Sequence, residues 1–201
     1  PSFTKFCTKL GADALEITAA PPLKPPDKKV TVVTNPHFNT LLVHEVVGHP
    51  SELDRALKYE TGYAGRSWFL KDMQDNQLGN QIASPMVTAY SDPTMEGYGS
   101  FSYDHEGTPA RRAYILRNGV LEEFLNNRQT AAIMGVEPNG SARSTEAQLV
   151  PLIRMTNTIF EAGKQDPQDI ISEVDDGYYV DGHRTPSITE SRENFRITAS
   201  K

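Results

Sequence analysis

The chain has 201 residues and a hydrophobic content of 37%, enough for one sizeable folded domain or for one domain plus an appendage. Its formal net charge of −6 offers no electrostatic footprint for nucleic acid or an anionic membrane, so we expect neither as a partner. No apolar run approaches the roughly 20 residues that span a bilayer, and no apolar leader is visible. Together with a single cysteine, Cys7, this favours a cytoplasmic protein.

The first 34 residues predict a helix, a linker and a strand. Residues 3–18 carry apolar side chains at helical spacing, and residues 19–27 contain four prolines, which force an extended segment. Residues 29–34 are rich in β-branched side chains and predict a strand. Asn35-Pro36 is interpreted as a turn, followed by a helix with Asn39 or Thr40 as its N-cap.

The rest of the sequence alternates short predicted strands, turns and helices. A helical pattern resumes at residues 52–57, and Asn118-Gly119 predicts a two-residue hairpin turn. A short helix is expected over 127–134, and another begins with Asp166 as N-cap. The predicted strands are 87–90, 98–103, 112–117 and 122–125. The expected fold class is therefore α+β, mostly antiparallel β-sheet with a few helices.

The segment His44-Glu45-Val-Val-Gly48-His49 carries the residues from which a metal site is built. Two histidines five residues apart lie about 140° apart around a straight α-helix and cannot share a metal. Gly48 weakens the helix, and Pro50 clashes with the carbonyl four residues earlier, so we expect a kink or π-bulge here. Such a distortion would let both imidazoles bind one zinc ion, with Glu45 as the general base.

This segment resembles the metal-binding helix of the TldD/PmbA family of metallopeptidases. The resemblance continues, in order, through Tyr98-Gly-Ser100, Asp104–Pro109, Gly135–Gly140 with Arg143, and Arg154–Thr158 with Glu161-Ala-Gly163. The chain is similar to the TldD-like branch, because the paralogous subunit of the family lacks the histidine–glutamate pattern.

The resemblance implies a cytoplasmic zinc peptidase that hydrolyses short or unfolded peptides held as extended strands. It implies one zinc per chain, His44 and His49 as ligands, Glu45 as the catalytic residue, and a homodimer or a heterodimer with the paralogue. It further implies that residues 1–28 end an N-terminal domain plus linker. Residues 29–201 would then be a metallopeptidase domain that is incomplete at its C-terminus.

One feature departs from the family pattern. The family's third ligand is a cysteine in a Gly-rich motif near the C-terminus, whereas Cys7 lies upstream of the proline linker. Residues 194–201 alternate like a strand in mid-course, so we expect a fragment. Three functions remain open: a zinc peptidase, a non-catalytic peptide-binding or assembly subunit, and a metal hydrolase that acts on another substrate.

Other polar residues have a functional and a structural interpretation. Glu52 could reach the metal or orient one of its ligands, and Arg143, Arg154 and Asn157 could contact substrate, but each could equally serve packing or the surface. Asp54 is a weaker candidate, and His105 could be a metal ligand or part of a polar turn. No residue is assigned to an organic cofactor.

Overall fold

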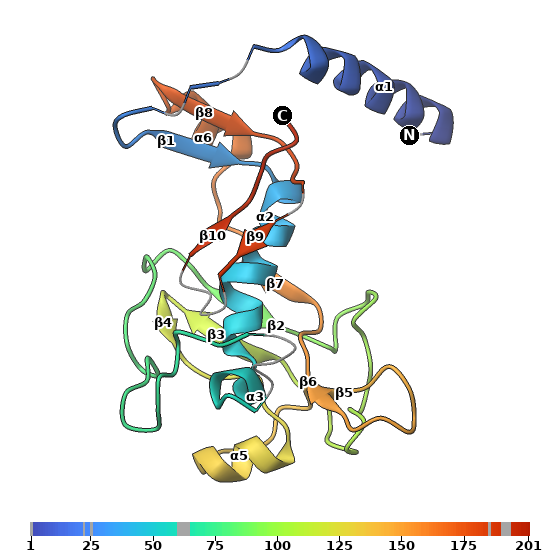
Figure 1. The fold of residues 1–201 in the computed structure, drawn as a ribbon, viewed down its shortest axis with the longest axis vertical. Helices are drawn as coiled ribbons and strands as arrows, with labels where there is room; N and C mark the ends of the chain where they lie inside the picture. The colour runs from blue at the N-terminus through green and yellow to red at the C-terminus, as the bar shows by residue number, and fades with distance from the viewer. Residues whose placement is uncertain (1, 22, 25, 60–64, 185, 190–193) are drawn as a thin grey trace.

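The structure is a computed structural model that describes residues 2–21, 23–24, 26–59, 65–184, 186–189 and 194–201 (Figure 1). The elements in chain order are α1 (Phe3–Ala19), β1 (Thr31–Thr34), α2 (Pro36–Val43), η1 (His44–Gly48), η2 (His49–Ser51), α3 (Leu53–Ala56), β2 (Ala89–Ser91), β3 (Ala113–Arg117), β4 (Val120–Leu121), α5 (Arg128–Met134), β5 (Ala142–Arg143), β6 (Leu152–Ile153), β7 (Thr158–Phe160), α6 (Pro167–Ser172), β8 (Gly177–Val180), β9 (Ser187–Ile188) and β10 (Phe195–Arg196). Within these ranges, no helix has both the length and the apolar content for crossing a membrane.

The main sheet has the strand order β4–β3–β2–β7, and all neighbours in it are antiparallel. Asn118 and Gly119 join β3 to β4 with φ angles of 49° and 78°, the positive values that a tight hairpin turn requires. The pairs β5–β6 and β9–β10 are also antiparallel, whereas β1 and β8 pair in parallel. The predicted α+β class with mostly antiparallel sheet is confirmed.

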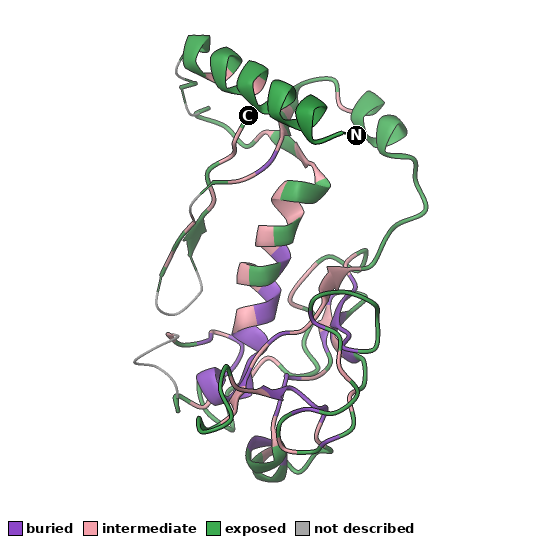
Figure 2. Cartoon of the chain, turned by 90° about the vertical axis from the view of Figure 1, so that its right-hand side faces the viewer, coloured by how far each residue is buried: buried purple, intermediate pink, exposed green. Residues whose placement is uncertain are grey.

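The hydrophobic core lies at one end of the molecule, around the main sheet and the C-terminal part of the long helical segment. Val43 and Val47 enter it from that segment, Leu53 from α3, and Ile115 and Ile153 from the strands. Figure 2 shows the buried residues gathered there, while α2 extends away toward the exposed α1 helix. The helical segment is therefore packed most tightly where η1 and η2 follow α2.

The α2 helix begins earlier than the sequence predicted. Asn35 is its N-cap, with Oδ1 accepting a hydrogen bond from the backbone N–H of Phe38 at 2.8 Å, and Pro36 is the first helical residue. The predicted N-cap at Asn39 or Thr40 is wrong. Proline suits a first helical position because its fixed φ is helical and its missing N–H would have no partner there.

Two of the predicted strands are also wrong. Residues 98–103 form no strand, because Asn157 and the neighbouring turns fold this segment into a compact loop. Pairing of β4 ends at Leu121, and residues 122–125 continue irregularly until Leu125 forms a bridge with Glu52. The helices expected near residues 3–18 and 127–134, and the one capped by Asp166, are confirmed.

Candidate metal centre

The helix is distorted at the motif itself. Residues His44–Gly48 form one turn of π-helix, in which the backbone N–H of His49 donates to the carbonyl of His44, five residues earlier. A short 3₁₀ turn with Pro50 in its first positions follows immediately. Residues five apart are one turn apart in a π-helix and therefore share a face. The distortion predicted from Gly48 and Pro50 is confirmed.

Side-chain hydroxyls donate hydrogen bonds to backbone carbonyls at the distortion, where regular α-helical hydrogen bonding is interrupted. The hydroxyl of Ser51 donates to the carbonyl of Gly48 at 2.6 Å, and the hydroxyl of Ser67 donates to the carbonyl of Pro50 at 2.6 Å. Both serines are buried, where an unpaired carbonyl would be costly. The irregular backbone is thus held in place by its surroundings.

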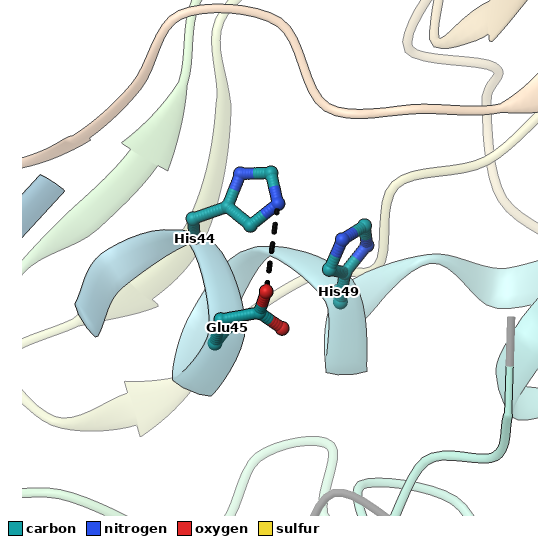
Figure 3. A group of neighbouring side chains, drawn as sticks. All are labelled: His44, Glu45 and His49. Atoms are coloured by element: carbon teal, nitrogen blue, oxygen red, sulfur yellow. Dashed lines mark ion pairs between the residues drawn. The ribbon is translucent and has the colours of Figure 1, made fainter. Parts of the chain in front are cut away.

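The π turn brings the two imidazoles together (Figure 3). Their ring centroids are 4.4 Å apart with an angle of 82° between the ring planes. Glu45 Oε1 lies 3.9 Å from His44 Nε2, and one ligand atom from each of the three residues falls within 4.8 Å of the others. Among the residues that the structure describes, this is the group of histidine, cysteine and acidic side chains that could hold a metal ion.

The two histidines differ in their surroundings. The His44 side chain is 48% exposed, whereas that of His49 is 19% exposed and rests on a fully buried carboxylate. Glu52 Oε2 lies 2.9 Å from His49 Nδ1 and accepts from Arg55 Nε at 3.0 Å and from Arg55 Nη2 at 2.5 Å. Glu52 and Arg55 are 0% and 2% exposed, respectively. His49 is therefore held in place by the buried Glu52–Arg55 pair, whereas His44 is more exposed to solvent.

The charge of Glu52 is fixed by its neighbours. Burial on its own raises the pKa of Glu52, but the hydrogen bonds and charges of His49 and Arg55 outweigh burial and place the pKa below its ordinary value. Arg55 Nη2 also lies 2.9 Å from His49 Nδ1, and a guanidinium has no acceptor. The carboxylate is therefore the group that accepts from both the imidazole and the guanidinium.

Two further contacts fix the helical segment of residues 44–56 to β6 and the segment after it. Asp54 Oδ2 accepts from the backbone N–H of Ile153 at 3.0 Å, and burial raises the pKa of Asp54. A Cβ on Gly48 would lie 1.8 Å from the sulfur of Met155, so only glycine lets the helix approach this closely. Gly48 thus serves close packing as well as the distortion.

The other sequence candidates fall into separate places. Arg143 and Arg154 line one cleft together. Asn157 instead organises the loop at residues 92–99, with its amide donating to the carbonyls of Asp92 and Met95 and accepting from Gly99. His105 Nδ1 accepts from the backbone N–H of Ser144.

Two residues near the motif, Arg55 and Met155, are not among the candidates predicted from the sequence. Arg55 follows Glu52 by three residues, a spacing that places both on one helix face and is a readable signal. Met155 carries no such signal, because only the tertiary fold brings it to Gly48. Cys7 lies in α1, is exposed, and is not part of the His44–Glu45–His49 group.

Three comparisons show which known proteins this chain resembles. The model of the PmbA/TldA metallopeptidase C-terminal domain matches residues 27–201. A metalloprotease from Methanothermobacter thermautotrophicus is 34% identical over 96% of this chain, and a zinc metalloprotease TldD homolog from Saccharolobus solfataricus is 29% identical over 74% of it. The crystal structure of TldE from Thermococcus kodakarensis superposes with a TM-score of 0.67 at 26% identity, covering 88% of this chain and 38% of that one.

These findings define the class of protein. The chain belongs to the PmbA/TldA (TldD/PmbA) metallopeptidase family. It spans 39% of the length of the Methanothermobacter relative and 31% of the Saccharolobus one. Two imidazoles that lie together are donors that suit a zinc ion, and the Glu45 carboxylate lies beside them.

Proposed function

We propose that this chain supplies the catalytic helix of a zinc-dependent peptidase that hydrolyses short or unfolded peptides. The observation that carries the proposal is the π turn, which places His44 and His49 with their rings 4.4 Å apart and Glu45 beside them. A straight helix would separate the histidines. The π turn therefore brings two potential zinc ligands together, which packing of the helix alone would not require.

Each of the three residues has a distinct role in this proposal. His44 and His49 would hold the zinc ion through imidazole nitrogens. When bound, zinc polarises the substrate carbonyl and lowers the pKa of the attacking water toward about 7. Glu45 takes a proton from that water and passes it to the leaving amine. Its side chain is only 11% exposed, and one of its oxygens lies within 4.8 Å of a ring nitrogen of each histidine, close enough to share a bound water.

Glu52 and Arg55 act through His49. A carboxylate that accepts from Nδ1–H holds the imidazole in one orientation and leaves Nε2 with its lone pair for the metal. Arg55 keeps that carboxylate ionised and in place. Both are positioning residues, since His49 lies between them and the metal.

We propose further that the whole protein works as a homodimer or with a paralogous subunit, and that residues outside this chain complete the coordination of the metal. The relatives are more than twice as long as the chain, which leaves room for such residues. The chain itself supplies two imidazoles and the general base.

The test uses the full-length protein and a fluorogenic peptide. We expect Glu45→Gln to lower kcat by on the order of 10²–10⁴-fold, because the proton acceptor is lost. Chelation should abolish cleavage and added zinc should restore it. The matched control is Glu173→Gln, which changes an exposed glutamate after α6 and should leave activity unchanged. Cleavage that survives both chelation and Glu45→Gln would contradict the proposal. Peptide binding without cleavage in the wild type would favour a non-catalytic binding subunit instead.

A further inference from the structure

The β5–β6 ribbon has two chemically different faces. Ala142 pairs with Ile153, and both are 0% exposed on the core side. Arg143 pairs with Leu152, and the alternation of a strand places both on the opposite side. The pairing continues one step further, because the backbone N–H of Arg154 donates to the carbonyl of Ser141 at 3.0 Å. Arg154 therefore joins Arg143 and Leu152 on the outer face.

This outer face forms one wall of a cleft of about 480 Å³. The loop between the two strands forms the other wall, with Leu149 and Val150, which are 50% and 81% exposed. The cleft thus combines two guanidinium groups with three aliphatic side chains. Aliphatic side chains this exposed beside fixed charges are typical of surfaces that bind a ligand.

Both arginines are held by backbone carbonyls of the chain. Arg143 Nη1 donates to the carbonyl of Met155 at 3.1 Å, and its guanidinium lies 5.5 Å from the centre of the Phe101 ring. None of the ion pairs found among the described residues involves Arg143. Arg154 Nη1 donates to the carbonyl of Ile153, and Asp54 Oδ2 lies 4.0 Å away. The guanidinium of Arg143 is therefore the positive charge that this cleft offers to a ligand.

Residues that line or support the cleft also contact the helical segment of residues 44–56. Met155, whose carbonyl holds Arg143, packs its sulfur against Gly48 in the π turn. Asp54, which lies near Arg154, belongs to α3 and bonds to the backbone of Ile153. The outer face of the ribbon is therefore linked to the π turn through Met155, and to α3 through Asp54.

We propose that this cleft binds the free C-terminal carboxylate of a peptide whose last residue is apolar, an inference that rests on the proposed peptidase function. Guanidinium groups pair with carboxylates in a bidentate fashion and are the preferred partners for them. Arg143 and Leu152 face each other across the ribbon, with Cβ atoms about 5 Å apart in such a pair. A terminal apolar residue presents a carboxylate and an aliphatic side chain on one Cα, which matches this juxtaposition.

The experiment measures binding without turnover in full-length Glu45→Gln protein. Three forms of one hexapeptide ending in leucine serve as probes: the free acid, the C-terminal amide, and the amide with glutamate at the fifth position. We expect the free acid to bind at least about tenfold more tightly than either amide, from loss of a charge-assisted hydrogen bond. Adding Arg143→Gln should remove this preference, and Arg143→Lys should retain part of it. The control Arg117→Gln removes an exposed arginine outside the cleft and should retain all of it.

Three results would overturn the inference. The free acid and the amide could bind equally, the preference could persist unchanged in Arg143→Gln, or the glutamate-containing amide could match the free acid. The comparison of peptides needs no change in the cleft, so a misfolded variant cannot imitate the first or third result. Because no cleavage is measured, a failure of zinc-dependent hydrolysis leaves the binding result intact. Equal binding, conversely, leaves the proposed hydrolysis untouched.

Discussion

The two ends of the long helical segment are built in different ways. At its beginning, α2 stands next to β1 and β8, whose side chains are exposed or half-buried, and α1 beyond them has no buried residue. At its end, η1, η2 and α3 pass into the hydrophobic core and carry buried charges (Figure 2). The same continuous segment is thus lightly packed at one end and fully enclosed at the other.

The enclosed end is where the backbone is irregular. A π turn and a 3₁₀ turn lose regular helical pairing, and side chains such as Ser51 and Ser67 replace it. An irregular backbone persists only where its surroundings determine it. The contrast teaches that the packing of this end serves to hold a distorted helix in the one geometry in which His44 and His49 meet.

Breaking the buried ion pair behind His49 should have the largest effect on stability. Arg55→Met leaves the Glu52 carboxylate buried without its cation, which we expect to cost about 3–5 kcal/mol in the free energy of unfolding. Chemical denaturation measures it. The matched control is Arg117→Met, whose ion pair with Glu122 is about half exposed and should contribute less than about 1 kcal/mol. Equal losses in the two variants would contradict the contrast between the ends.

The same truncation at the two ends should give very different results. Leu53→Ala in α3 removes a side chain that is 1% exposed and should cost about 2–5 kcal/mol. Leu10→Ala in α1 removes one that is 51% exposed and should change stability by less than about 0.5 kcal/mol. Thermal and urea unfolding of the two variants measure the difference. A large loss in Leu10→Ala would show that α1 is packed in solution.

A pair of glycine substitutions should change stability in opposite directions. Gly48→Ala drives a methyl group into the sulfur of Met155 and should cost about 1–3 kcal/mol. Gly11→Ala in α1 meets no atom within 4 Å and should stabilise by about 0.5–1 kcal/mol, since alanine favours helix. Met155→Ala should recover part of the loss in Gly48→Ala. If Gly48→Ala were stabilising as well, close packing would not be the reason for this glycine.

The smallest effect concerns acid stability. Burial raises the pKa of Asp92, but hydrogen bonds from Thr94 and Arg112 outweigh it and place the pKa below the ordinary value of 3.8. A lowered folded-state pKa adds stability above the ordinary value, which is lost as the pH falls below about 4. Asp92→Asn should lower the free energy of unfolding at neutral pH by about 1 kcal/mol. It should also reduce the acid limb, that is, the fall in the free energy of unfolding as the pH drops below about 4.

The exposed end of the molecule offers the control for that measurement. The pKa of Asp13 is also lowered, through its hydrogen bond with Lys9, but this pair is exposed on α1. Salt should screen it, so Asp13→Asn should leave the acid limb nearly as it was in 0.5 M salt. An acid limb that disappears with Asp13→Asn and persists with Asp92→Asn would reverse the expected roles.

Local signals made much of this structure predictable. Gly48 and Pro50 predicted the distortion, Asn118-Gly119 the hairpin, and Asp166 a helix start, because each acts on the backbone within a few residues. The unpredicted features depend on distant partners. Asp54 bonds to Ile153, 99 residues away, and Asn157 turns residues 98–103 into a loop instead of a strand.

The candidate site divides in the same way. The pairing of His44, Glu45 and His49 follows from the spacing and the local breakers. The fully buried state of Glu52 and Arg55 does not, because burial depends on the packing of the core around them. Arg143 and Arg154 line one cleft because β5 pairs with β6, and no local sequence pattern predicted that pairing.

The most direct test of the central claim is the zinc content of the full-length protein, measured together with peptidase activity in the same samples. We expect about one zinc per chain and activity in the wild type, zinc without activity in Glu45→Gln, and loss of both in His49→Ala. Zinc that binds His49→Ala as tightly as the wild type, or cleavage by Glu45→Gln at the wild-type rate, would contradict it.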